Sequence, residues 1–397
     1  MRALLLFSLV SLTLLGCASH PEETNELSKK HTMEQRVDLA QLRNVRLHPD
    51  GVVPEEPYRF WEDEQPTFLL GDEPGEPRLR PQGERLTVLA LSGGGANGAY
   101  GAGVLNGLSH NNQLPTFDVV TGISAGALIA PFAFLGDERL DELHEVMVEI
   151  DDKTILGRKN FLRTLFKDAF TSGKQILALV TETYPEEFID ELAEQHRLGR
   201  RLFIGTTHIE AGRLIIWNIG AIANSDLPNR IELIHQILAG SAAIPGVFPP
   251  QFIPVYQDGQ IREEMHVDGG VTAQVFFDPS GFGYGQISDS LGLSERPKVY
   301  VVRNGFITVP YQKIKDSGVE LLKRTVSNMM VQQTQGDLYR IGYFSEILDF
   351  EMAYTAIDED FYIGEHKKMF EPAALERLYQ YGYDKAVKGK VWQTPPQ

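Results

Sequence analysis

The sequence predicts an α/β fold with a mostly parallel central sheet that helices cover on both faces. Two short apolar runs, 86–91 and 117–121, have the length of a strand, and each leads through glycines into a helical stretch. Fully apolar strands that alternate with helices are typical of parallel sheets buried on both faces. Further strands are expected at 201–207, 213–218, 265–267 and 298–303, and helices at 99–108, 127–135, 140–149, 161–170, 185–195 and 230–239.

The composition changes after about residue 306. A long helical pattern at 319–335, a short strand at 349–353 and a helix at 373–387 follow there. We therefore interpret 86–305 as one α/β domain. We interpret 306–397 as a mainly helical extension that covers the sheet or makes an oligomer contact, with no chemistry of its own.

The overall charge excludes some classes of partner. The 397 residues include 37 basic and 54 acidic side chains, for a net charge of −17. Nucleic-acid binding needs a basic face, and binding to anionic lipid by charge alone needs basic clusters, so neither is expected. The chain has one cysteine, which excludes intramolecular disulfides and multi-cysteine metal sites. We expect no metal and no cofactor.

The first 17 residues indicate where the protein is located. Arg2 precedes an apolar stretch, 3–15, that is shorter than the roughly 20 residues of a membrane-spanning helix but suits a signal peptide. The stretch ends at Gly16, and the next residue, Cys17, is the only cysteine. This resembles a bacterial lipoprotein signal over 1–16, which implies that Cys17 is lipidated and holds the chain on a bilayer. The following Ala18 favours the outer membrane, facing the periplasm. The alternative is a plain secretory signal with a chance cysteine.

Residues 17–85 are rich in Glu, Pro, Asp and Arg and show no sustained periodicity. Such a composition is typical of a loop or linker. The aromatic residues of 58–61 and the apolar residues of 68–70 favour partial docking on the domain instead. The sequence leaves both a free tether and a docked arm open.

The segment from Gly122 to Gly126 has the form Gly-x-Ser-x-Gly, with Ser124 at its centre. A serine on a sharp turn between a strand and a helix needs small neighbours so that its hydroxyl is accessible. The helix that follows also places the positive end of its dipole at the serine. We therefore interpret Ser124 as a candidate nucleophile.

A second glycine-rich turn, Gly93–Gly94–Gly95 with Gly98 beyond it, follows the first strand. Bare glycines let backbone N–H groups converge on an anion. The segment lacks the spacing of the known phosphate-binding and dinucleotide-binding loops. Beside a candidate nucleophile, an oxyanion hole is the better interpretation.

A serine nucleophile also needs a base. Asp268 follows a short strand and precedes two glycines, which permit a close approach. His266 would lie on the same face of that strand, so a Ser-His-Asp arrangement also stays open. The histidines with weaker claims are His110, His144, His196, His208 and His235.

These motifs, in this order, resemble the patatin-like phospholipases. A fourth match is the segment 240–250, which is similar to a Ser-x-Ala-x-Pro…Phe-x-Pro segment of that family. The resemblance covers 86–305 and implies a three-layer α/β/α fold. It also implies that Ser124 is the nucleophile, that Asp268 is its base, and that the N–H groups of Gly94 and Gly95 form the oxyanion hole.

The resemblance implies a lipid acyl hydrolase that cleaves fatty-acyl esters through an acyl-enzyme. One position departs from the family, because many members have Arg or Lys where this chain has Asn97. Neutral esters, or phospholipids held through their acyl chains, are therefore the expected substrates. A lysophospholipase, acylglycerol hydrolase or thioesterase with the same dyad stays open, as does a lipoprotein that binds lipid or a partner without catalysis.

Residues 276–285 combine aromatic side chains with glycines. Aromatic residues favour the membrane interface, so the segment is either a lid or membrane-dipping loop, or part of the core.

Overall fold

The computed structural model describes residues 39–71, 78–149, 174–276, 283–309, 311, 313–363 and 370–394. Within these residues the chain forms a nine-stranded sheet. The strands are β1 (Arg59–Trp61), β2 (Thr87–Leu91), β3 (Val119–Ile123), β4 (Arg201–His208), β5 (Arg213–Asn218), β6 (Gln251–Gln257), β7 (Gln260–Asp268), β8 (Lys298–Phe306) and β9 (Glu351–Ile357).

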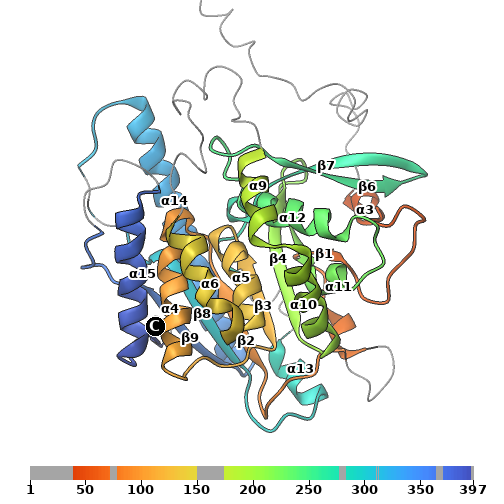
Figure 1. The fold of residues 1–397 in the computed structure, drawn as a ribbon, viewed down its shortest axis with the longest axis horizontal. Coiled ribbons are helices and arrows are strands. Elements are labelled where there is room, and N and C mark those ends of the chain that lie inside the picture. The colour runs from red at the N-terminus through yellow and green to blue at the C-terminus, as the bar shows by residue number, and fades with distance from the viewer. Residues whose placement is uncertain are drawn as a thin grey trace, which may run out of the picture.

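The sheet has the order β1-β5-β4-β3-β2-β8-β9, and β7 pairs with both β4 and β6. From β4 to β9 all neighbours are parallel, whereas β1, β5, β6 and β7 form antiparallel pairs. The β6–β7 hairpin extends away from the main body of the sheet (Figure 1). The mostly parallel α/β sheet that the sequence predicts is confirmed.

Helices are α3 (Leu39–Arg43), α4 (Gly98–His110), α5 (Ala125–Leu135), α6 (Asp137–Val148), α9 (Lys174–Thr183), α10 (Glu186–Arg197), α11 (Ile219–Ala223), α12 (Arg230–Ser241), α13 (Tyr284–Ser290), α14 (Gly318–Ile347) and α15 (Pro372–Val387). Short 3-10 turns lie at η1 (Thr67–Leu70), η2 (Gly95–Asn97) and η3 (Gly269–Val271). The expected helix at 161–170 lies outside the described residues.

Both faces of the sheet are buried, because side chains of β2 alternate between two cores. Leu89 and Leu91 pack with α4, α5, α6, α10 and α12, and Figure 1 shows α4, α5 and α6 in front of the sheet. Val88 and Ala90 pack on the opposite face with α13 and the second half of α14. This arrangement accounts for the fully apolar strands of the sequence, since each strand residue faces one core or the other.

The segment before residue 86 docks on the domain where the structure describes it. Phe60 and Trp61 are buried in β1, which pairs with the edge strand β5, and Leu69 of η1 is buried as well. The sequence did not predict β1, because a three-residue strand carries no periodicity of its own. The sheet therefore includes residues from before 86.

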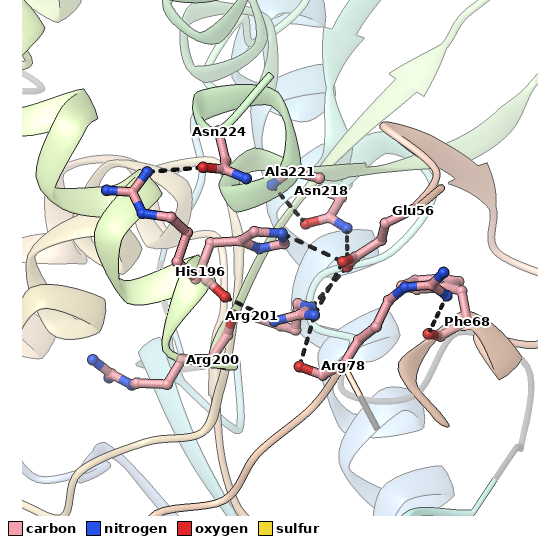
Figure 2. Close-up of polar contacts among 10 residues, drawn as sticks. Glu56, Phe68, Arg78, His196, Arg200, Arg201, Asn218, Ala221 and Asn224 are labelled. Carbon is pink, nitrogen blue, oxygen red and sulfur yellow. Dashed lines mark hydrogen bonds and ion pairs between the residues drawn. The ribbon is translucent and has the colours of Figure 1, made fainter. Parts of the chain in front are cut away.

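A buried ion pair holds this segment in place (Figure 2). The Glu56 carboxylate accepts hydrogen bonds from Arg201 at 2.7 and 3.0 Å and from Asn218 Nδ2 at 2.7 Å. His196 Nε2 lies 3.3 Å from the same carboxylate. Arg201 Nη2 also donates to the backbone carbonyl of Arg78, at 2.9 Å. Breaking such a pair leaves an uncompensated buried charge, so these contacts fix the segment against β4.

The chain after residue 306 also belongs to the sheet and its layers. Strand β9 pairs with β8, and α15 packs against α4, where Asn106 Nδ2 donates to Tyr379 Oη at 2.8 Å. Helix α14 is longer than the predicted 319–335, and its second half packs on the sheet through Leu338 and Ile341. None of the helices in the described part of the chain has the length and apolar character needed to cross a bilayer.

Candidate active site

The candidate nucleophile, Ser124, lies between the end of β3 and the start of α5. Its backbone has φ 55° and ψ −123°, a conformation that residues other than glycine rarely adopt. A Cβ at Gly126 would lie 2.3 Å from the Leu91 carbonyl oxygen, so only glycine fits at this second residue of α5. The Ser124 N–H donates to Ser241 Oγ at 3.0 Å. The strand–turn–helix that the sequence predicts here is therefore present.

The structure brings Ser124 and Asp268 together, although 144 residues separate them in the sequence. Ser124 Oγ donates to Asp268 Oδ2 at 2.6 Å, and each residue is 5% exposed. Asp268 is the last residue of β7 and pairs with Thr206 of β4. Its other oxygen, Oδ1, accepts the Gly270 N–H at 2.7 Å. The glycines that follow Asp268 thus allow a backbone amide to orient the carboxylate.

The buried environment changes the acidity of this carboxylate. Loss of solvent raises the pKa of Asp268 to about 6, while the hydrogen bonds from Ser124 and Gly270 act in the opposite direction. The group is therefore ionised at neutral pH, yet it accepts a proton far more readily than an exposed aspartate.

The glycine-rich turn lies directly beside Ser124. A Cβ at Gly93 would lie 3.3 Å from Ser124 Cβ, and a Cβ at Gly94 would lie 2.0 Å from the Asn304 carbonyl oxygen. Glycine at position 94 is thus required by close contact with β8. Within the described residues, the N–H groups of Gly94 and Gly95 donate to no acceptor. Unpaired amides near a serine hydroxyl are the arrangement that an oxyanion hole needs.

Two other predicted residues, Gly98 and Asn97, lie at the end of this turn and the start of α4. Gly98 begins α4, and a Cβ there would lie 2.5 Å from Met147 Cε, in the wall of the neighbouring pocket. Asn97, where the family resemblance expects a basic residue in many members, ends the turn η2 and is half-buried.

A pocket of about 590 Å³, including its open mouth, begins at Ser124 and Gly95. Aliphatic and aromatic side chains of α5, α6, α9 and the segment after α12 make up most of its wall. They include Leu128, Met147, Ile176, Val180, Ile244 and Phe248. A pocket of this apolar character suits an apolar ligand with its polar end at the serine.

Among the residues that the structure describes, no histidine lies beside Ser124. His266 is fully buried, and its ring nitrogens contact Thr206 Oγ1 at 2.9 Å and Glu264 Oε2 at 3.3 Å. His110, His144, His196 and His235 contact Asp141, Glu376, Glu56 and the Tyr184 carbonyl, and His208 lies by Glu264 and His266. The Ser-His-Asp arrangement with His266 is therefore not formed, and Asp268 contacts the serine directly.

Several supporting residues were not identified from the sequence. Ser241 Oγ receives the Ser124 N–H and donates to the Gly205 carbonyl at 2.7 Å, so it links the serine turn to β4. Its place in the 240–250 segment was the only signal for it. Gln274 and Arg303 hydrogen-bond to Gly93 of the glycine-rich turn. Neither residue lies in a local sequence motif that would have identified it.

Cys17 and residues 277–282 of the proposed lid segment lie outside the described residues. At the ends of that segment, Phe276 and Tyr284 are buried in the core.

The middle of the chain matches a known protein family. Residues 89–279 match the family model "Patatin-like phospholipase". Over 81 residues the chain is 40% identical to the cUMP-AMP-activated phospholipase of Escherichia coli, covering 20% of this chain and 25% of that protein. Over 202 residues it is 27% identical to Patatin-2-Kuras 2 of Solanum tuberosum, covering 48% of this chain and 50% of that protein. The matches thus span a quarter and a half of these relatives.

Among solved structures, VipD from Legionella pneumophila is similar, with a TM-score of 0.40 and 14% identity over 79% of this chain and 68% of that one. The family match covers the serine turn, the glycine-rich turn and Asp268. Residues 89–279 of this chain therefore form a patatin-like phospholipase domain.

Proposed function

We propose that this protein hydrolyses fatty-acyl esters of lipids, with Ser124 as the nucleophile and Asp268 as the general base. The observation that carries the proposal is the 2.6 Å hydrogen bond from Ser124 Oγ to Asp268 Oδ2, in a buried site that opens into an apolar pocket. The coarser assignment, a lipid hydrolase, agrees with the family match.

In the first step, Asp268 takes the hydroxyl proton as Ser124 Oγ attacks the ester carbonyl. The raised pKa of Asp268 makes this transfer less unfavourable than it would be with an exposed carboxylate. The N–H groups of Gly94 and Gly95 stabilise the negative charge on the tetrahedral intermediate. In comparable sites one such donor contributes about 2.7–4 kcal/mol.

Collapse of this intermediate breaks the bond to the alcohol, which leaves with the proton from Asp268. The fatty-acyl group then remains on Ser124 Oγ as an ester. A water molecule that gives its proton to the same carboxylate attacks this ester and releases the fatty acid. Asp268 therefore serves as base and then acid in each half of the reaction.

The pocket supports an acyl chain as the recognised part of the substrate. Its wall, from Leu128 to Phe248, is apolar and begins at the nucleophile, so a fatty chain placed there has its carbonyl at Ser124. Head-group contacts are not needed for this binding. Hydrolysis rates on a panel of phospholipids, lysophospholipids, acylglycerols and thioesters that all carry the same type of acyl chain will separate these substrate classes.

Covalent labelling with a fluorophosphonate tests the proposal against a non-catalytic lipid-binding protein. The wild-type protein should be labelled, and Ser124→Ala should not be. Asp268→Asn should lose both labelling and ester hydrolysis at neutral pH. Ser288→Ala, a buried serine of α13 in the other core, is the matched control and should label as the wild type does. Labelling that persists in Ser124→Ala would refute the assignment.

We further propose that a lipid on Cys17 anchors the protein to the bacterial cell envelope, with the outer membrane facing the periplasm as the expected site. The support is the apolar stretch 3–15 followed by the only cysteine of the sequence. Metabolic labelling with a palmitate analogue should mark the wild type but not Cys17→Ala, and the variant should leave the membrane fraction. A variant that stays membrane-bound would contradict this anchor.

A further inference from the structure

The glycine-rich turn lies against a buried arginine from β8. Arg303 is 5% exposed, and its Nη1 donates to the Gly93 carbonyl at 2.8 Å and to Ser92 Oγ at 3.3 Å. Burial lowers the pKa of Arg303 to about 10, an effect that the Asp337 carboxylate partly offsets. The guanidinium therefore stays charged at neutral pH.

The Gly93 carbonyl and the Gly94 N–H belong to the same peptide group. A charged donor on the carbonyl draws electron density away from the amide nitrogen, which makes the N–H a stronger donor. Because the site is buried, the positive charge also acts on a developing oxyanion with little screening by water. Through this contact, Arg303 polarises the Gly94 N–H, which is one of the two candidate oxyanion donors.

The same contacts fix the position of the turn. The Gly93 N–H donates to the Gln274 carbonyl at 3.0 Å. The Asn304 N–H donates to Ser92 Oγ at 2.9 Å, and Asn304 Nδ2 donates to the Ser92 carbonyl at 2.8 Å. The Ser92–Gly93 peptide, which directly precedes the Gly93–Gly94 peptide, is therefore tied to β8 and to the segment after Asp268.

The acidic partner of Arg303 comes from α14. Asp337 Oδ2 accepts the N–H groups of Gln274 and Val275 at 3.0 and 3.3 Å, and Oδ1 lies 3.3 Å from Arg340 Nη2. Gln274 Nε2 in turn donates to the Gly270 carbonyl at 2.6 Å, next to the amide that orients Asp268. A helix of the 306–397 extension, for which the sequence predicted no chemistry, thus supports both halves of the site.

We propose that Arg303 is a positioning residue for hydrolysis: it holds the Gly93–Gly94 peptide and polarises it, so that the Gly94 N–H binds the oxyanion more strongly. The inference rests on the proposed function. It assigns a role to a residue outside the 89–279 family match, with Asp337 of α14 as its counter-ion.

The test compares full-length Arg303→Met and Arg303→Lys with the wild type, using p-nitrophenyl butyrate in detergent micelles. Arg200→Met is the matched control, because Arg200 is also buried, also has its pKa lowered to about 10 by burial, and donates to the Phe117 carbonyl away from Ser124. Removal of one oxyanion donor costs about 100- to 1,000-fold in kcat, so loss of its polarisation should cost roughly 10- to 100-fold. KM should stay within about threefold, since the oxyanion forms only in the transition state.

Arg303→Lys keeps a positive charge that is able to titrate. Burial lowers the pKa of a lysine below its ordinary value of about 10.4, so this variant should lose kcat as the pH rises from about 7 to about 9. The wild type and Arg200→Met should show no such loss between about pH 7 and 9, because Arg303, with a pKa of about 10, stays charged there. Circular dichroism at each pH separates this loss from unfolding. If Arg303→Met fails to fold, the pH dependence of kcat in Arg303→Lys still tests the role of Arg303.

Three results would overturn the inference: wild-type kcat in folded Arg303→Met, a loss confined to KM, or a flat alkaline profile in folded Arg303→Lys. A wild-type protein that neither hydrolyses esters nor labels at Ser124 would overturn the proposed function instead, and the inference with it. Measurements on the wild type alone therefore distinguish failure of the proposed function from failure of this inference.

Discussion

Replacement of Asp268 by asparagine should stabilise the fold at neutral pH while it abolishes hydrolysis. The carboxyl group has a pKa near its ordinary 3.8 in the unfolded chain and about 6 in the folded protein. The folded state therefore binds the proton more tightly, and ionisation of Asp268 costs stability. This cost is complete well above pH 6 and disappears as the pH falls below 3.8.

The shift sets the size of the effect. A difference of about 2.2 pKa units corresponds to about 3 kcal/mol at pH 7, and to about 1 kcal/mol at pH 4.5. An asparagine has the size of the neutral aspartic acid and never ionises. The variant should therefore exceed the wild type in free energy of unfolding by about these amounts, measured by urea denaturation at both pH values.

Glu264→Gln on the same strand is the control with the opposite sign. Burial favours its neutral form, but the ion pair with Arg59 and the hydrogen bond with His266 hold the pKa of Glu264 below its ordinary value. Its charge therefore contributes stability at neutral pH, and Glu264→Gln should destabilise. The reasoning is refuted if Asp268→Asn is no more stable than the wild type at pH 7, or if its advantage grows as the pH falls.

Three further outcomes are expected. The kcat/KM for a short-chain ester should fall about tenfold per pH unit below pH 6, because Asp268 must be unprotonated to act as base; activity that is constant down to pH 4.5 would contradict this role. Leu128→Trp should fill part of the pocket and shift the preferred acyl chain to shorter lengths in a chain-length series, and an unchanged preference would mean that the chain binds elsewhere. Glu56→Gln should lower the free energy of unfolding by about 3–5 kcal/mol, because Arg201 then stays buried without its counter-charge. Glu55→Gln, at the exposed neighbouring position, should change the free energy of unfolding by less than about 0.5 kcal/mol in the same urea titration.

The sequence predicted those parts of the fold and site whose physical cause is local. Ser124 and the glycine-rich turn stand out because a strand must turn sharply into a helix there, and only small neighbours fit. The apolar strands β2 and β3 stand out because both of their faces are buried. The sequence alone did not decide whether Asp268 contacts Ser124 directly or through His266. The geometry shows the direct contact.

The parts that were missed have causes elsewhere in the chain. Strand β6 contains Pro254 and, among the described strands, pairs only with β7, so its sequence lacks the pattern of a central strand. The expected strand at 265–267 is part of the longer β7, whose charged first half lies on the projecting hairpin. Arg303 contacts Gly93 across 210 residues, and no local pattern indicates such a partner.

Docking of the chain before residue 86 limits how far an anchored enzyme is able to move. The chain is packed on the domain from α3 (Leu39–Arg43) onwards, since Arg43 pairs with Asp63 and the Gln41 carbonyl accepts from Gln257. With the proposed lipid on Cys17, about 22 residues separate the anchor from α3, and their fully extended length is roughly 70–80 Å. A link that stayed loose up to residue 86 would reach more than twice as far. An enzyme anchored in this way would therefore work within that shorter distance of its membrane.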